Sequence, residues 1–203
     1  MNYNFDVVQF VSTCSDMGGI VNVMGCRRKT PEKIVYIAGQ SDAGKTTILY
    51  KYKLGTNHPI ETCHTTGYFQ ETIVHRGISF NMVDMGGGEK ILPCWLRVFD
   101  NASVLIFVID STDTMCISTS DYYLRSWIEN LEKNQLVVLI FANKQDLPNA
   151  MTVEELTDKM NLKSLRIPWH IQPASAINGE GINEGLDWLC QTIWNTENGE
   201  SLN

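Results

Sequence analysis

The sequence of 203 residues has no C-x-x-C pair, no long apolar run and few basic residues. Its six cysteines are scattered, which favours free thiols in a reducing compartment over disulfides or zinc. No window has the roughly 20 apolar residues that cross a bilayer, and the start lacks the order of a secretory signal. A net charge of −7 argues against nucleic acid as the main partner. We therefore expect a cytoplasmic protein, with peripheral membrane attachment left open.

The rest of the composition describes an ordinary globular protein, with 43% apolar and 19% charged residues. From Ile34 onward, apolar runs typical of strands alternate with helical patterns, which predicts an α/β fold with helices on both faces of the sheet. The strands expected are 34–38, 72–75, 78–83, 103–110, 137–142 and a short one around 170–172. The link at Arg76 and Gly77 is so short that its two strands must be antiparallel, so this six-stranded sheet is mixed and mostly parallel.

The expected helices begin at Thr47, near Asp121, after a cap near Thr152, and at Ile182. Periodicity predicts that Tyr122 and Trp194 face the core, each with the leucines and isoleucines of its own helix. Residues 55–71 have weak periodicity and should form a mobile loop. We divide the chain into an extension at 1–30, a domain at 31–195 and a polar tail at 196–203.

Residues 1–30 leave two interpretations open. Phe5, Val7, Val8, Phe10 and Val11 could form one apolar face of a membrane-facing helix, or the segment could be a disordered or loosely docked extension. The polar face carries little positive charge, which favours the second interpretation.

The stretch from Gly39 to Thr46 has the spacing of a phosphate-binding P-loop, which is a glycine, four residues and then Gly-Lys-Thr. It lies between an expected strand and an expected helix, as that motif requires. Glycines let backbone N–H groups surround a phosphate, and the helix directs its positive end at the same anion. Lys45 would contact the β- and γ-phosphates and Thr46 would ligate Mg²⁺. The sequence therefore predicts nucleotide binding.

A second acidic element follows the strand at 78–83. Asp84 could hold Mg²⁺ through water, and Gly87 could present its backbone N–H to a γ-phosphate. The pattern D-x-x-G is common alone, so its value depends on the P-loop upstream.

Base specificity is carried by Asn143-Lys144-Gln145-Asp146, which follows the strand at 137–142. We call these four residues the base-recognition motif. The Asp146 carboxylate can accept hydrogen bonds from the N1–H and N2–H₂ edge of guanine, a donor pair that adenine lacks. Asn143 can meet the other purine edge, and the Lys144 stem can cover the ring face. Backbone amides of residues 174–176 could contact the guanine oxygen.

With these motifs in place, residues 34–194 resemble the Arf/Arl (ADP-ribosylation-factor and Arf-like) branch of the small GTPases. The resemblance also rests on the stretches 43–51, 141–150 and 184–189. It implies the P-loop small-GTPase fold, GTP/GDP and Mg²⁺ as ligands, and effectors, exchange factors and activating proteins as partners. It further implies a switch in vesicle and protein trafficking, on Golgi or other endomembranes, with the 72–83 hairpin as a sliding element. The nucleotide-binding residues are then Gly39, Asp42, Ala43, Gly44, Lys45, Thr46, Thr47, Thr65, Asp84, Gly87, Asn143, Lys144, Asp146, Ser175 and Ala176, with Thr46, Thr65 and Asp84 as metal ligands.

Departures from the family matter for catalysis and partners. Gly88 occupies the position where the family has a water-positioning glutamine, so no catalytic residue is assigned and intrinsic hydrolysis should be slow. The family's P-loop aspartate stands one place later, at Asp42 instead of Ser41. Of the aromatic cluster shown to effectors, Tyr68 remains, but Val83 and Val98 replace the others.

Residue 2 is Asn, so the family's N-myristoyl glycine is absent from this start. Met24-Gly25-Cys26 resembles an internal start, but Lys29 stands where that motif needs Ser or Thr. Two functions remain in competition: a slow GTPase switch, and a GTP-held interaction module that has lost hydrolysis. A P-loop kinase or ATPase is a distant third, because the base-recognition motif excludes ATP.

Overall fold

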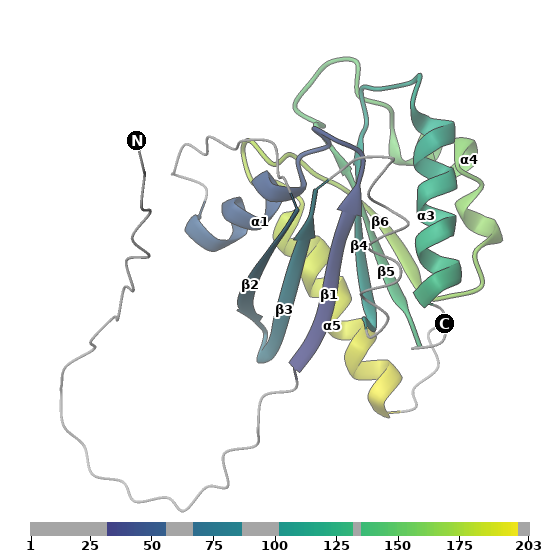
Figure 1. The fold of residues 1–203 in the computed structure, drawn as a ribbon. Coiled ribbons are helices and arrows are strands. Elements are labelled where there is room, and N and C mark those ends of the chain that lie inside the picture. Colours follow the sequence, from purple (N-terminus) through teal and green to yellow (C-terminus); the bar gives the residue numbers. More distant parts are fainter. Residues whose placement is uncertain (1–31, 56–66, 87–101, 132–134, 199–203) are drawn as a thin grey trace, which may run out of the picture.

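One mixed sheet forms the centre of the molecule (Figure 1). The computed structural model describes residues 32–55, 67–86, 102–131 and 135–198. In their order across the sheet, the strands are β2 (Tyr68–His75), β3 (Ile78–Met85), β1 (Glu32–Gly39), β4 (Val104–Asp110), β5 (Val137–Asn143) and β6 (Trp169–Pro173). Only β2 and β3 are antiparallel, and every other neighbouring pair is parallel. The predicted six-stranded, mostly parallel sheet is confirmed.

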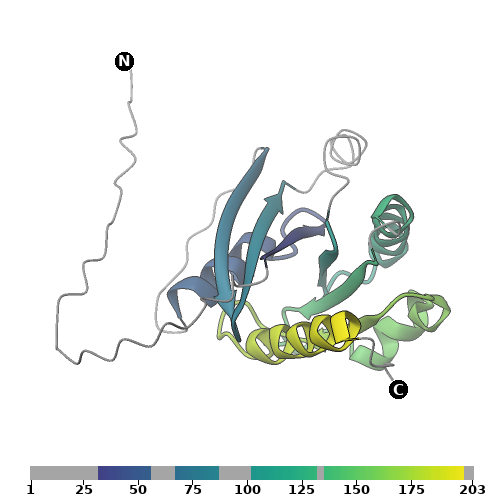
Figure 2. The ribbon, with the colours of Figure 1, turned by 90° about the horizontal axis from the view of Figure 1, so that it is seen from below.

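Helices cover both faces of this sheet, as predicted. In the described part of the chain they are α1 (Lys45–Leu54), α3 (Ile117–Leu131), α4 (Val153–Lys159), the 3₁₀ turn η2 (Leu162–Ser164) and α5 (Ile182–Asn198). Figure 2 shows α5 along one side of the sheet and α3 on the other. Successive residues of β1 divide between the two cores: Val35 packs with α1 and α5, whereas Tyr36 packs with α3 and α4. Because both faces are buried, the middle of each central strand is apolar, and the polar residues lie at the strand ends.

The start of α4 confirms the predicted cap. The Thr152 hydroxyl accepts a hydrogen bond from the Glu155 N–H at 3.2 Å, and the Glu155 carboxylate accepts one from the Thr152 N–H at 2.8 Å. This reciprocal capping box satisfies two backbone donors that would otherwise lack intrahelical partners.

Several sequence-based expectations on element bounds and burial were wrong. Helix α3 begins at Ile117 and not near Asp121, and Tyr122 is 66% exposed. Its buried neighbours Ser120 and Leu124 each lie two positions away, so a 3.6-residue period puts Tyr122 on the opposite side. Helix α5 continues to Asn198, three residues into the segment assigned to the polar tail, and its last turns extend past the sheet (Figure 1). Trp194, in the second half of this helix, is 60% exposed. Strand β2 begins at Tyr68, inside the loop expected over 55–71.

The hairpin turn between β2 and β3 is tied to both helices of its face. The hydroxyl of Tyr52 in α1 lies 2.8 Å from His75 Nδ1, and His75 Nε2 lies 2.6 Å from Asp187 Oδ1 in α5. Arg76 also donates to the Asp187 carboxylate, and this hydrogen bond lowers the pKa of that carboxyl. Side chains 111 positions apart therefore hold the far end of the hairpin.

Several expectations fall outside the described residues. They are the extension at 1–30 with its possible start at Met24, most of the loop at 55–71, and the end of the polar tail. Within the described ranges, no helix has the length and apolar character needed to span a bilayer.

Gly185 provides a test of the packing between α5 and the sheet. A β-carbon there would lie 2.7 Å from Cε1 of Phe141. We predict that Gly185→Ala lowers the free energy of unfolding by about 1–3 kcal/mol, because the clash outweighs the helix propensity gained. Denaturant unfolding measures this, with the exposed Gln191→Ala as a control that should change stability by less than about 0.5 kcal/mol. Greater stability in Gly185→Ala would contradict the close packing.

Candidate functional site

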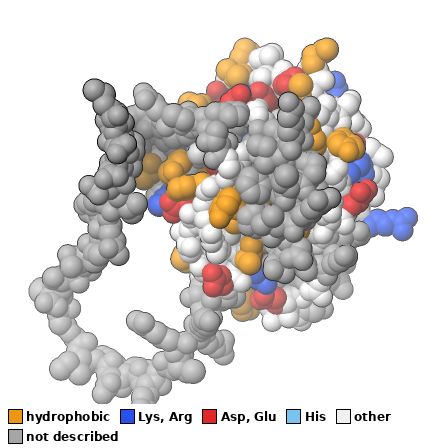
Figure 3. Space-filling model, viewed as in Figure 1, with side chains coloured by type: hydrophobic (Ala, Val, Ile, Leu, Met, Phe, Trp, Pro, Cys, Tyr) orange, Lys and Arg blue, Asp and Glu red, His pale blue; other side chains and the backbone are white. Residues whose placement is uncertain are grey.

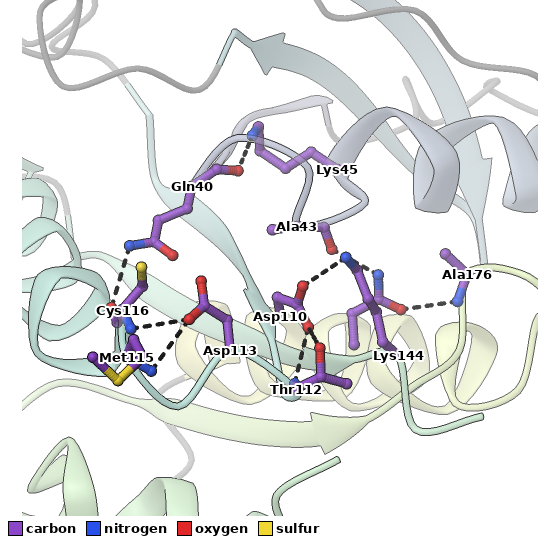
Figure 4. Close-up of polar contacts among 11 residues, drawn as sticks. Gln40, Ala43, Lys45, Asp110, Thr112, Asp113, Met115, Cys116, Lys144 and Ala176 are labelled. Atoms are coloured by element: carbon purple, nitrogen blue, oxygen red, sulfur yellow. Dashed lines mark hydrogen bonds and ion pairs between the residues drawn. The ribbon is translucent and has the colours of Figure 1, made fainter. Parts of the chain in front are cut away.

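The polar motifs meet at one edge of the sheet. Strands β1, β3, β4, β5 and β6 are mutually parallel, so their carboxyl ends lie on the same side. This arrangement gathers the P-loop after β1, Asp84 in β3, Asp110 in β4 and Asn143 in β5. The turn at 174–176 follows β6 at the same edge (Figure 4). Crevices outside the carboxyl ends of parallel strands are the usual ligand sites of α/β folds.

Two P-loop glycines are required by close contacts. Gly39 has φ +138°, and a β-carbon there would lie 2.2 Å from the Val108 carbonyl oxygen. Gly44 has φ +98°, and its β-carbon would lie 2.2 Å from Asn143 Nδ2. Neither position accommodates a side chain without moving a neighbouring strand or the Asn143 side chain. The loop is therefore shaped by β4 and by the base-recognition motif as well as by its own sequence.

Lys45 is buried, and backbone carbonyls of the P-loop hold its ammonium. Nζ donates to the carbonyl oxygens of Gly39 at 3.1 Å and Gln40 at 2.7 Å. Burial lowers the pKa of Lys45, although the negative charges of Asp84 and Asp42 oppose that shift. A positive charge in this desolvated position would gain from a polyanionic ligand. Figure 4 shows the contact between Lys45 and Gln40.

Thr46 and Asp84 lie together beside the P-loop, and their side-chain oxygens suit a divalent cation. The Thr46 hydroxyl donates to Asp84 Oδ2 at 2.5 Å. Asp84 is fully buried, and its Oδ1 has no hydrogen-bond partner among the described residues. Burial raises the pKa of this carboxyl, opposed by the Thr46 hydrogen bond and the Lys45 charge. A buried carboxylate oxygen without a donor fits a hard cation or its water shell.

Asn143 joins the P-loop to the turn after β6. Its Nδ2 donates to the Ala43 carbonyl oxygen at 2.7 Å, and its Oδ1 accepts from the Ala176 N–H at 2.9 Å. The side chain is almost completely buried. Both ends of the amide are therefore engaged within the protein. Contact with a purine edge stays a prediction, and the geometry gives Asn143 a scaffolding role in addition.

Lys144 follows with a left-handed backbone, at φ +69°. Its Nζ lies 2.6 Å from Asp110 Oδ2. Next to it, Gln145 donates to the Ser111 hydroxyl at 3.0 Å and to the Met151 carbonyl at 3.1 Å. The base-recognition motif is thus fixed from the end of β4.

Asp146 is exposed at the rim of the site, and Ser175 holds it in place. The buried Ser175 hydroxyl donates to Asp146 Oδ1 at 2.6 Å. The backbone of Gln145 bonds to the Ala174 carbonyl at 3.1 Å, which keeps the two segments together. An oriented carboxylate at the surface can accept a pair of hydrogen bonds from a ligand.

Most predicted site residues come together in this way. The structure brings to one edge Gly39, Asp42, Ala43, Gly44, Lys45, Thr46, Thr47, Asp84, Asn143, Lys144, Asp146, Ser175 and Ala176. Asp42 is exposed with φ +59°, a backbone that aspartate tolerates better than most residues. Thr65, Gly87 and Gly88 lie outside the described residues.

The sequence analysis did not assign roles to Asp110, Thr112 and Gln145. Their hydrogen bonds hold the base-recognition motif against the end of β4. A usable signal existed for Asp110: an acidic residue ends an otherwise apolar strand next to the strand of the base-recognition motif. Gln40 was also missed, and its Nε2 donates to the Cys116 carbonyl at 3.2 Å, which ties the P-loop to the start of α3 (Figure 4).

Comparison with known proteins supplies independent information. A model of the ADP-ribosylation factor family matches residues 19–193. Among solved structures, the chain is similar to the Arl6 (BBS3) small GTPase from Trypanosoma brucei with bound nucleotide analogue GppNp. The two are 29% identical with a TM-score of 0.70, and the match covers 79% of this chain and 96% of that one.

Removal of the Asn143 bridge is the direct test of this architecture. We predict that Asn143→Ala lowers the free energy of unfolding by about 2–4 kcal/mol without added nucleotide, because two buried backbone groups lose their partners. Thermal and denaturant unfolding measure the change. The exposed Asn183→Ala, in the first turn of α5, should change stability by less than about 0.5 kcal/mol. Equal stability of Asn143→Ala and the native chain would contradict the bridge.

Proposed function

Because this chain belongs to the ADP-ribosylation factor family of small GTP-binding proteins, we propose that it is a slowly hydrolysing switch that recruits effectors in intracellular trafficking. The chain binds guanine nucleotide and acts as a GTP-binding switch. The hydrolysis rate, the magnesium ion, the role of each site residue, the membrane and the effectors belong to the proposal. The observation that carries it is the convergence of the P-loop and the base-recognition motif through Asn143.

Guanine selectivity is assigned to Asp146. Its carboxylate accepts from the guanine N1–H and N2–H₂ groups, and the Ser175 hydrogen bond supports this by orienting the acceptor. Adenine would leave the carboxylate without those donors, and a site built for donors rejects a base that lacks them. The Ala176 N–H is assigned to the guanine oxygen, and since it donates to Asn143 Oδ1 in this structure, it would have to share or exchange that acceptor when the base binds.

The phosphates are assigned to the P-loop amides and Lys45. Thr46 and Asp84 would hold Mg²⁺, together with Thr65 by resemblance to the family. When bound, the ion supplies positive charge that neutralises the phosphates. Asp84 contributes a buried oxygen without a donor, and Lys45 contributes a buried ammonium already aligned along the loop. These two side chains thus orient the phosphate end of the ligand.

Hydrolysis is expected to be slow because Gly88 has no side chain to orient the attacking water. Activating proteins supply much of the rate in this chemistry, so an off-switch need not reside in this chain. The same glycine favours the second candidate, a GTP-held interaction module without intrinsic hydrolysis. Catalysis alone separates the two functions.

Partner choice is expected to differ from that of typical relatives. Tyr68 is 54% exposed on β2, and Phe69 and Val74 of the same strand are exposed too. Val83, at a second aromatic position of the family, is buried in the α3 side of the core. On the side of the molecule seen in Figure 3, apolar side chains are interspersed with charged and neutral ones. We propose a cytoplasmic protein that contacts the Golgi or another endomembrane peripherally, through residues 1–30.

Asp146→Asn tests the nucleotide assignment. The amide would place a donor against the guanine donors, so we predict that GTP affinity falls by about a hundredfold or more while xanthosine triphosphate gains. Competition among GTP, xanthosine triphosphate and ATP for the purified chain measures the preference. The exposed Asp158→Asn serves as the matched control and should keep guanine preference. Retained guanine selectivity in Asp146→Asn would overturn the assigned role.

Gly88→Gln tests the catalytic assignment. We predict that single-turnover hydrolysis of preloaded GTP with Mg²⁺ becomes about tenfold faster or more, because the new amide can orient water. Gly88→Ala adds a side chain without an amide and should keep the native rate. An unchanged rate in Gly88→Gln would show that another group is limiting. No turnover by the native chain, with an active glutamine variant, would select the GTP-held module.

A further inference from the structure

The ammonium of Lys144 pairs with Asp110, a residue outside the base-recognition motif at 143–146. Asp110 Oδ2 lies 2.6 Å from Lys144 Nζ, and the two side chains are 18% and 30% exposed. Strand register produces this contact, because Asp110 pairs directly with Asn143 across β4 and β5. Lys144 is the next residue, so the parallel pairing brings together two side chains 34 positions apart.

Asp110 is itself held rigidly. Its Oδ1 accepts from the Thr112 N–H at 2.9 Å and from the Thr112 hydroxyl at 2.7 Å. One carboxylate oxygen thus binds the turn and the other binds the lysine (Figure 4). Although burial opposes it, hydrogen bonding from Lys144 and Thr112 lowers the pKa of Asp110, which keeps the carboxyl charged at neutral pH.

A lysine side chain has four rotatable bonds, and ordering it loses more rotamer entropy than ordering most other side chains does. If the stem is to cover the face of a base, an anchor at its end removes that cost before the ligand arrives. The left-handed backbone at Lys144 already sets the direction in which the stem leaves the strand. The Asp110 contact sets where the stem ends.

We propose that Asp110 is a positioning residue for guanine-nucleotide binding, which fixes the Lys144 ammonium so that the lysine stem is ordered to cover the base. This inference rests on the proposed role of residues 143–146 in base recognition. Asp110 touches no nucleotide in this proposal and acts through Lys144 alone.

The test is a double-mutant cycle on the dissociation rate of fluorescently labelled GDP from the full-length chain. Asp110→Asn keeps an oxygen for Thr112 and presents an amide NH₂ to the ammonium. Lys144→Met keeps an apolar stem and removes the charge. We expect each single variant to release labelled GDP about tenfold faster, as loss of one charge-assisted hydrogen bond implies. The double variant should be no faster than either single variant, because both remove the same interaction.

Additive effects in the cycle would overturn the positioning role and leave Asp110 as a structural residue of the turn. Lys144→Arg offers a second measurement, because arginine keeps a cation for Asp110. In the chain that retains Asp110, this variant should release labelled GDP at a rate close to the native one. Dissociation as fast as in Lys144→Met would count against the proposal. This comparison holds even if Asp110→Asn folds poorly.

Two controls separate this inference from the proposed function. Asp158→Asn disrupts an exposed Asp–Lys pair outside the site and should leave dissociation unchanged. If the native chain, folded by circular dichroism, fails to bind labelled GDP, the proposed function and this inference both fail. If it binds and the cycle is additive, only the positioning role of Asp110 fails.

Discussion

The site depends on one buried amide. Asn143 donates to the P-loop through Ala43 and accepts from the turn after β6 through Ala176. It is the side chain that joins the phosphate-binding loop directly to the turn that orients Asp146. The Asn143 side chain has almost no access to water, so an unpaired amide group there would cost much free energy. Its two hydrogen bonds are therefore strongly favoured. The same amide explains why residue 44 must be glycine.

Charge is the second constraint, and it points to the ligand. Lys45 and Asp84 are both buried, and burial shifts their pKa values in opposite directions, each toward the neutral form. A folded protein tolerates such groups where a ligand of opposite charge restores the lost solvation. An anion at the lysine and a cation at the aspartate would do so together. Nucleotide phosphates and a divalent ion have this combination of charges.

The far end of the molecule is stabilised in a different way. The β2–β3 hairpin is joined to α1 and α5 by Tyr52, His75, Arg76 and Asp187, at the end of the strands away from the nucleotide site. Its other end, near Tyr68 and Met85, lies beside Asp84. The hairpin therefore connects the site with a polar cluster on the opposite edge of the sheet.

Much of this was readable from the sequence, because the relevant signals are local. The P-loop spacing, the apolar strands at 103–110 and 137–142, the short hairpin link and the cap at Thr152 each depend on residues close together in the chain. Burial of Tyr122 and Trp194 was mispredicted, since an aromatic residue near an apolar stripe can face either side. The pairing of Asp110 with Lys144, the bridge through Asn143 and the anchoring of the hairpin were decided only by the tertiary structure. Those contacts depend on which strands become neighbours and in what register, and no local pattern specifies that.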